Sequence, residues 1–166
     1  MMREHAGWLA QIDRPSDGNA MNARRRAKLL EGVAPLLEAG EQVQISTLAT
    51  VGSVSMKKKM LTAAVAGIAS GGLLTVNVRP RPMYTVLTDR RILFFDSTST
   101  GGPGKHMATL SRSVVTISGL KKAQFGLAVV TQLSVANQER GIRVLFPAAS
   151  KAAGREFAAA LPLTQE

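Results

Sequence analysis

The chain has 166 residues, a formal net charge of +10 and no cysteine. This length is enough for one domain with its own core plus a short extension, and the lack of cysteine excludes disulfide bonds and thiolate metal sites. Residues 41–166 carry 15 Lys and Arg against 6 Asp and Glu, so most of the positive charge lies there. Such an excess favours an anionic partner, whether lipid headgroups, nucleic acid or an acidic protein, although a basic solvated surface equally explains any single residue.

Residues 1–21 are predicted to form an extension outside the folded domain, because much of this stretch is polar and rich in turn-forming residues. Met21 is a candidate natural start of the protein. The first residues lack the long apolar core of a secretory signal. Together with the absence of cysteine, this favours a reducing compartment and a cytoplasmic location.

A helical segment is predicted over residues 22–40. Asn22 is a good N-cap residue, and apolar residues follow it at helical spacing. Gly32 and Pro35 are expected to kink or divide the helix. Basic residues crowd its first turns, at the end where the helix dipole disfavours positive charge. They are Arg24, Arg25, Arg26 and Lys28. A solvated basic face is the simpler interpretation of this cluster, and a contact with a phosphate is the alternative.

Residues 41–51 alternate as a first strand, and an uncharged run over residues 60–78 follows. This run approaches the roughly 20 residues that span a bilayer, but small and weakly polar residues dominate it. A span would separate the strands before and after it, so a buried helix followed by a strand over 74–78 is preferred. Peripheral membrane contact and a true span are the alternatives. The flanking basic residues, which are the candidate binding residues for an anionic partner, are Lys57, Lys58, Lys59, Arg79 and Arg81.

The central stretch of the chain reads as two strands joined by a tight turn. Residues 84–88 alternate as a pleated strand, and residues 92–95 form an apolar and aromatic run typical of a buried strand. Asp89 stands where the chain must reverse, and aspartate is favoured in turns because it bonds to its own backbone.

The rest of the chain predicts more short strands and one helix. Two short strands, or one strand with a break, are expected over 107–112 and 113–120, and further strands over 127–135 and 142–146. Lys121 and Lys122 are expected to form a charged turn. A final amphipathic helix is predicted between Ser150, as its cap, and Pro162. About seven strands and one amphipathic helix predict a mainly β, α+β fold, in which the helix closes one end of a bent sheet or barrel.

Four segments carry a resemblance to a known family. They are residues 37–41, 84–95, 107–111 and 154–158. Through them the sequence resembles the bacterial pleckstrin-homology-like (PH-like) domains over residues 37–161, and Leu-Thr-Asp-Arg-Arg-Ile-Leu-Phe-Phe is the most specific part. The resemblance implies a seven-stranded, partly open barrel capped by a C-terminal helix, and a scaffold that binds ligands or partners. The apolar insertion replaces the compact basic loop of phosphoinositide-binding members, so phosphoinositide recognition is not carried over.

The expected organisation is one PH-like domain with additions at both ends. The domain covers 41–162 and carries an apolar insertion at 57–78. The extension over 1–21 and the helical segment over 22–40 precede it, and a tail over 163–166 follows.

No set of residues in the sequence predicts an enzyme. His5 and His106 lie far apart without paired carboxylates, which argues against a metal site. The Gly-Gly-Pro-Gly-Lys run at 101–105 lacks the spacing and the Ser or Thr of a phosphate-binding loop. No catalytic residue, cofactor or metal ligand is therefore predicted.

The leading functional hypothesis is a non-enzymatic binding or scaffold module that binds another protein or assembles with itself. The first alternative is a peripheral adaptor at the inner face of a membrane, in which the basic residues flanking the insertion contact anionic lipid at about 1 kcal/mol each. The second is nonspecific nucleic-acid binding. Scarce aromatic residues argue against it, because four of them are expected in the core rather than stacked on bases. These four are Phe94, Phe95, Phe146 and Phe157.

Overall fold

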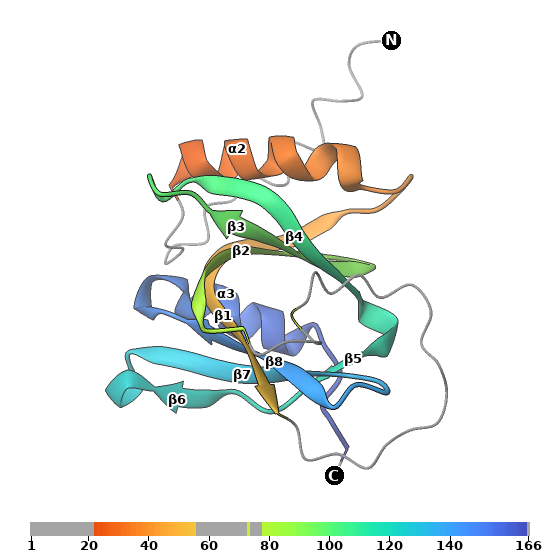
Figure 1. The fold of residues 1–166 in the computed structure, drawn as a ribbon, viewed down its shortest axis with the longest axis vertical. Helices are drawn as coiled ribbons and strands as arrows, with labels where there is room; N and C mark the ends of the chain where they lie inside the picture. Colours follow the sequence, from red (N-terminus) through yellow and green to blue (C-terminus); the bar gives the residue numbers. More distant parts are fainter. Residues whose placement is uncertain (1–21, 56–72, 74–77, 166) are drawn as a thin grey trace.

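The computed structural model describes residues 22–55, 73 and 78–165, which form one eight-stranded antiparallel sheet and two α-helices (Figure 1). The strands are β1 (Val43–Ser55), β2 (Arg81–Thr88), β3 (Arg91–Ser97), β4 (Pro103–Ser111), β5 (Val115–Ile117), β6 (Lys121–Ala123), β7 (Ala128–Val135) and β8 (Arg140–Phe146). The α-helices are α2 (Ala23–Val33) and α3 (Lys151–Ala159). Short 3-10 helices are η1 (Ala34–Leu36), η2 (Arg112–Val114), η3 (Gln124–Gly126) and η4 (Ala148–Ser150).

The long strand β1 joins the two halves of the sheet. Its residues from Val43 to Val51 pair with β2, and those from Thr50 to Ser55 pair with β8. The strand order is β4-β3-β2-β1-β8-β7-β5, and β6 pairs with β7 beside β5. Because β4 and β5 end this path, the sheet is partly open. The predicted mainly β architecture with an N-terminal and a C-terminal helix is confirmed.

The main hydrophobic core lies on the concave side of the sheet and is closed by α3. Phe157 of α3 packs on Phe146 of β8, with ring centroids 5.4 Å apart, and both side chains are fully buried. Gly154 allows this approach, because a Cβ atom there would lie 2.6 Å from Cγ of Phe146. The amphipathic helix predicted near the C-terminus therefore closes the core as expected.

A second core lies between α2 and the outer face of β2 and β3. Leu29 and Val33 of α2 pack there. Alternation along the two strands divides their apolar residues between the cores. Met83, Leu87, Ile92 and Phe94 belong to the main core, and Tyr84, Val86, Leu93 and Phe95 to the second. Burial on both faces explains why residues 92–95 form an unbroken apolar run rather than an alternating one.

The hairpin formed by β2 and β3 agrees with the sequence. Leu87 pairs with Ile92 and Tyr84 with Phe95, so the chain reverses at residues 89–90 as predicted. The side-chain bonds within the turn come from Thr88, whose Oγ1 atom accepts hydrogen bonds from the N–H groups of Arg90 and Arg91 at 3.1 and 2.8 Å. Asp89 instead joins the turn to the segment before β1, because its Oδ1 atom accepts from the backbone N–H of Gln42 at 2.9 Å.

Two local predictions differ from the structure. The segment at residues 121–123 is a short strand rather than a charged turn, because Lys121 and Lys122 pair through their backbone with Val130 and Val129 of β7. The strand expected over 113–120 is reduced to β5, since η2 occupies its first residues.

The ends of α2 and α3 also refine the predictions. Helix α2 continues through Gly32, and Pro35 lies within the first turn of η1 rather than inside the α-helix. The turn after η1 uses Gly40 at φ 77°, a conformation that glycine adopts without strain. Ser150 occupies the N-cap position of α3, but its side chain makes no capping hydrogen bond to the helix. The helix ends at Ala159, before Pro162.

Several predictions fall on residues outside the described part of the chain. These are the extension over 1–21, Lys57, Lys58, Lys59, and the uncharged run over 60–78 apart from Leu73 and Val78. Leu73 is buried in the main core. The backbone N–H of Val78 donates to Oγ of Ser53 in β1 at 2.6 Å. Among the described helices, none is both long and apolar enough to cross a bilayer.

The described residues of the predicted tail, 163–165, lie against the sheet. Leu163 forms a parallel bridge with Ile117 of β5, and the N–H of Thr164 donates to the Ile117 carbonyl oxygen at 2.7 Å.

Candidate functional site

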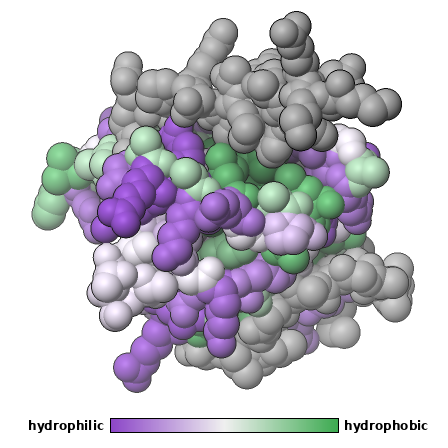
Figure 2. Space-filling model, turned by 90° about the horizontal axis from the view of Figure 1, so that it is seen from above, coloured by the Kyte–Doolittle hydropathy of each residue, from purple (hydrophilic) through white to green (hydrophobic). Residues whose placement is uncertain are grey.

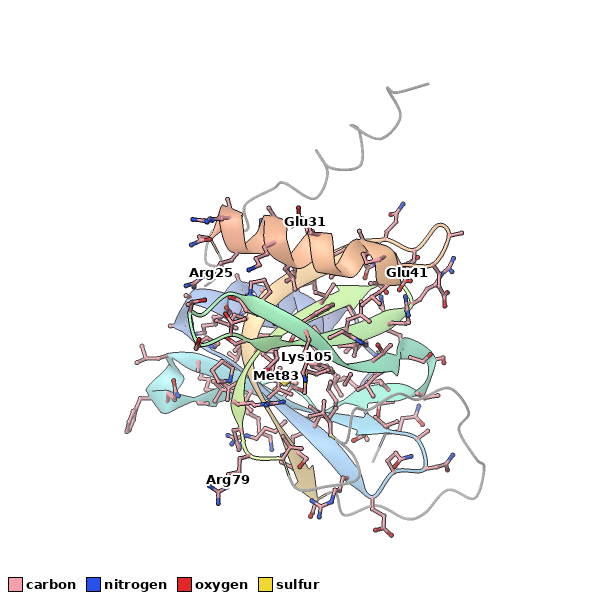
Figure 3. The ribbon with its side chains drawn as sticks, turned by 45° about the horizontal axis from the view of Figure 1, so that its top comes forward. Arg25, Glu31, Glu41, Arg79, Met83 and Lys105 are labelled. Atoms are coloured by element: carbon pink, nitrogen blue, oxygen red, sulfur yellow. The ribbon has the colours of Figure 1, made fainter. Side chains whose placement is uncertain are left out.

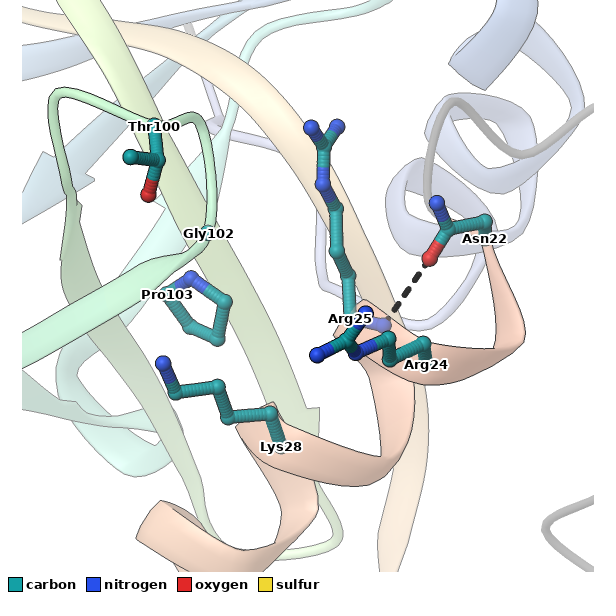
Figure 4. Close-up of a pocket in the computed structure, with 7 residues that line it drawn as sticks. All are labelled: Asn22, Arg24, Arg25, Lys28, Thr100, Gly102 and Pro103. Carbon is teal, nitrogen blue, oxygen red and sulfur yellow. Dashed lines mark hydrogen bonds between the residues drawn. The ribbon is translucent and has the colours of Figure 1, made fainter.

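The first turn of α2 forms one wall of a pocket. Asn22 caps the helix, because its Oδ1 atom accepts a hydrogen bond from the backbone N–H of Arg25 at 2.9 Å (Figure 4). This confirms Asn22 as the predicted N-cap. The cap fixes the start of a helix whose positive dipole end already carries a cluster of cations.

The turn between β3 and β4 forms the opposite wall. Thr98 holds it closed: its backbone N–H donates to the Gly102 carbonyl oxygen at 2.8 Å, and its Oγ1 atom accepts from the Gly102 N–H at 3.1 Å. Gly101 adopts φ 81°, in the left-handed region that favours glycine. The turn is therefore a defined structure rather than a loose connection.

A buried tyrosine supports this turn from below. The hydroxyl group of Tyr84 in β2 donates a hydrogen bond to the carbonyl oxygen of Gly101. Burial raises the pKa of Tyr84, while the positive charge of Arg25 acts in the opposite direction. The net pKa lies above the ordinary value, so the hydroxyl remains protonated and able to donate at neutral pH.

Together the two walls enclose a surface pocket of about 390 Å³. The pocket is lined by Asn22, Arg24, Arg25, Lys28, Thr100, Gly102 and Pro103. The Arg25 guanidinium lies against the turn, because a Cβ atom at Gly101 would be only 3.0 Å from its Nη2 atom. Arg24, Arg25 and Lys28 thus face the turn across the pocket (Figure 4).

The pocket is strongly cationic. Its lining contains three basic residues and no acidic one. The salt bridges among residues 22–55, 73 and 78–165 involve Arg81, Arg90 and Arg91, and none involves the basic residues of the pocket. Figure 2, which views the molecule from above, shows hydrophilic residues interspersed with hydrophobic ones on this side. An open pocket with unneutralised cations at a helix N-terminus has the chemistry of an anion-binding site.

The residues predicted from the sequence to bind an anionic partner do not line this pocket. Arg79 is exposed before β2 (Figure 3), and Arg81 begins β2, where its Nη1 atom lies 3.8 Å from Oδ1 of Asp96. Arg81 therefore already has a carboxylate partner, which leaves Arg79 as the more available cation of the two. Lys57, Lys58 and Lys59 lie outside the described residues.

One sequence signal pointed to the pocket. Cations in the first turns of a helix oppose its dipole, so a cluster there costs stability unless it has another use. The second wall could not be found in the same way. Residues 100–103 lie more than seventy positions from Arg24 along the chain, and only the packing of α2 on β2 and β3 brings the two segments together.

No protein-family model matches this chain, and no match was found among curated proteins.

Proposed function

We propose that the protein is a non-enzymatic PH-like binding module that docks on an anionic membrane surface through the basic pocket. The observation that carries the proposal is the convergence of Arg24, Arg25 and Lys28 on one open pocket without a carboxylate in its lining. Phosphate is the anion that suits this arrangement, because arginine forks and helix N-termini both bind phosphate oxygens well.

The topology supports the PH-like part of the proposal. Strands β1 to β4 form an antiparallel meander, and β1 passes into a second group of strands that ends in β8. A C-terminal helix then closes one end of the core. The resemblance of residues 84–95 and 154–158 implies seven strands and a closing C-terminal helix; the sheet has eight strands, one more than implied, and such a helix.

A membrane is favoured over self-assembly by the nature of the open sheet edge. Strand β4 ends the sheet path and offers an edge to which another strand could add. Its pairing with β3 is irregular on both sides of Phe95, and Lys105 and His106 are exposed along it. Bulges and charges of this kind oppose pairing with a second chain. Partnership with a protein, which the sequence placed first, therefore becomes the competing outcome of the test.

The electrostatic attraction of the pocket residues is too small to hold the protein on a membrane by itself. Each basic residue near an anionic bilayer contributes about 1 kcal/mol, so three supply about 3 kcal/mol. A dissociation constant of 1 mM requires about 4 kcal/mol, so these three residues alone would give binding weaker than millimolar. The pocket selects an anionic surface, and a further contact must add to its affinity.

Sedimentation with vesicles tests the proposal. The full chain is mixed with phosphatidylcholine vesicles that contain or lack phosphatidylglycerol, and we expect binding only to the anionic ones. The pocket variant R24Q/K28Q is expected to bind about thirty-fold more weakly, since it loses about 2 kcal/mol of attraction.

The matched control is R143Q/R155Q, which removes two exposed arginines that do not line the pocket and so has the same net charge. It should bind nearly as well as the wild type. Equal loss in both variants would show that only overall charge matters. Binding to a protein partner or to DNA in a salt series, without binding to vesicles, would reject the membrane role.

A further inference from the structure

The turn between β6 and β7 places two large apolar side chains in solvent. Phe125 has a relative exposure of 108% and Leu127 of 64%. The other aromatic phenylalanines of the described chain, at positions 94, 95, 146 and 157, are buried. No residue in the described part of the chain covers the Phe125 ring, so this turn departs from the rule that aromatic side chains are packed.

The backbone holds the turn in an unusual conformation. Gln124, Phe125 and Gly126 all have positive φ angles, of 50°, 58° and 85°. Bulky residues rarely adopt this region, and such conformations are concentrated at functional sites. The turn is closed by a hydrogen bond from the Leu127 N–H to the Gln124 carbonyl oxygen at 3.1 Å. Lys151 of α3 also donates from Nζ to the Gly126 carbonyl oxygen at 2.7 Å.

Two lysines precede the apolar tip along the chain. Lys121 and Lys122 precede it in β6 and are both exposed. No acidic residue occurs between positions 119 and 130. A loop with an aromatic residue at its tip and lysines next to it suits the interface of an anionic bilayer. The ring is buried there, and the ammonium groups contact lipid phosphates.

The position of the β6–β7 turn would allow one flat surface to contact both the turn and the basic pocket. Figure 1 places the β6–β7 turn and the N-terminal end of α2 on the same left side of the molecule, the helix toward the top and the turn toward the bottom. A protruding ring requires a matching pocket on a protein, whereas a bilayer receives it without one. One membrane surface can thus meet the turn and approach the basic pocket.

We propose that the β6–β7 turn is a membrane-insertion loop, in which Phe125 and Leu127 enter the boundary between headgroups and acyl chains while Lys121 and Lys122 contact lipid phosphates. The proposal rests on the proposed function for the identity of the partner. It adds the apolar contact that the basic pocket lacks.

Fluorescence of an F125W variant tests insertion directly. Trp8 is the single tryptophan of the chain, so the variant is made in a W8F background. Vesicles contain phosphatidylcholine with or without phosphatidylglycerol, and some carry brominated acyl chains as quenchers. We expect the indole emission to shift to the blue and to be quenched by brominated lipid, and only with anionic vesicles.

Sedimentation of two serine variants provides the matched comparison. F125S is expected to weaken binding to anionic vesicles about tenfold, for the loss of a partly buried ring. L163S removes another exposed apolar side chain, at 65% exposure, that lies outside the turn, and should bind like the wild type. Thermal unfolding checks that both variants remain folded, which the open position of Phe125 favours.

The outcomes separate this inference from the proposed function. If the wild type binds anionic vesicles but F125S binds equally well and the F125W indole is not quenched, the insertion loop is wrong and the pocket proposal stands. If the wild type does not bind anionic vesicles, both are wrong. If F125S instead abolishes a concentration-dependent dimer measured by light scattering, the turn is a self-association surface and the insertion loop is overturned.

Discussion

Arg91 binds the buried carboxylate of Glu41 with two parallel hydrogen bonds. Its Nε atom donates to Oε1 at 3.0 Å and its Nη2 atom to Oε2 at 2.6 Å. The Glu41 side chain is fully buried, and 21% of the Arg91 side chain is exposed. The hydroxyl of Thr88 and the backbone N–H of Glu38 also donate to this carboxylate. The pair therefore fastens the segment before β1 to the β2–β3 hairpin, with which α2 packs.

Replacing Glu41 by glutamine should destabilise the fold by about 3 kcal/mol, because Arg91 would be left partly buried without a counter-charge. Urea unfolding followed by circular dichroism measures the change. The control is E38Q, since Glu38 is 59% exposed and its pair with Arg90 belongs to the class worth less than about 1 kcal/mol. Similar losses in both variants would contradict this role of the buried pair.

Acid should weaken the protein through the same carboxylate. Burial alone raises the pKa of Glu41, but the hydrogen bonds from Arg91, Glu38 and Thr88 and the charge of Arg91 outweigh it and lower the pKa to about 2. Because this lies below the ordinary value of 4.5, the stabilisation is complete above about pH 4.5 and is lost as the pH falls toward 2.

The free energy of unfolding, measured by urea titration across this range, should therefore fall more steeply in the wild type than in E41Q. The two proteins should approach each other at the lowest pH. Parallel curves for both proteins would show that the carboxylate has no such linkage.

Adding a methyl group at Gly154 should loosen the closure of the core. The new Cβ atom would lie 2.6 Å from Cγ of Phe146, and overpacking of this kind costs about 1–3 kcal/mol. Thermal unfolding of G154A measures the loss. G119A is the matched control, because nothing lies within 4 Å of a Cβ atom at Gly119. If G154A proves as stable as G119A, the close contact between α3 and β8 does not constrain the fold.

Two substitutions of Asn22 should separate the stability of α2 from binding in the pocket. N22A removes the cap and should cost about 1 kcal/mol in unfolding free energy. N22D keeps a capping oxygen and should retain stability, but its negative charge in the pocket should weaken binding to anionic vesicles. Unchanged vesicle binding by N22D would place the anion contact elsewhere.

The sequence by itself determined the local secondary structure and the sides on which apolar residues lie. The β2–β3 hairpin, the cap at Asn22, the helix that carries Phe157 and the burial of four phenylalanines all agree with the predictions. Alternation, turn-forming residues and helical spacing depend only on neighbours within a few positions, so they can be predicted from the sequence alone. The PH-like assignment and the functional role remain predictions.

The tertiary structure alone decided what covers each face and which distant residues meet. Alternation showed that residues 84–88 have two faces, but only packing showed that α2 covers the outer one. Strand β6 exists because β7 offers it a partner, and its three residues carry no strand pattern of their own. The basic pocket and the Glu41–Arg91 pair likewise depend on contacts between segments far apart in the chain, which no local pattern records.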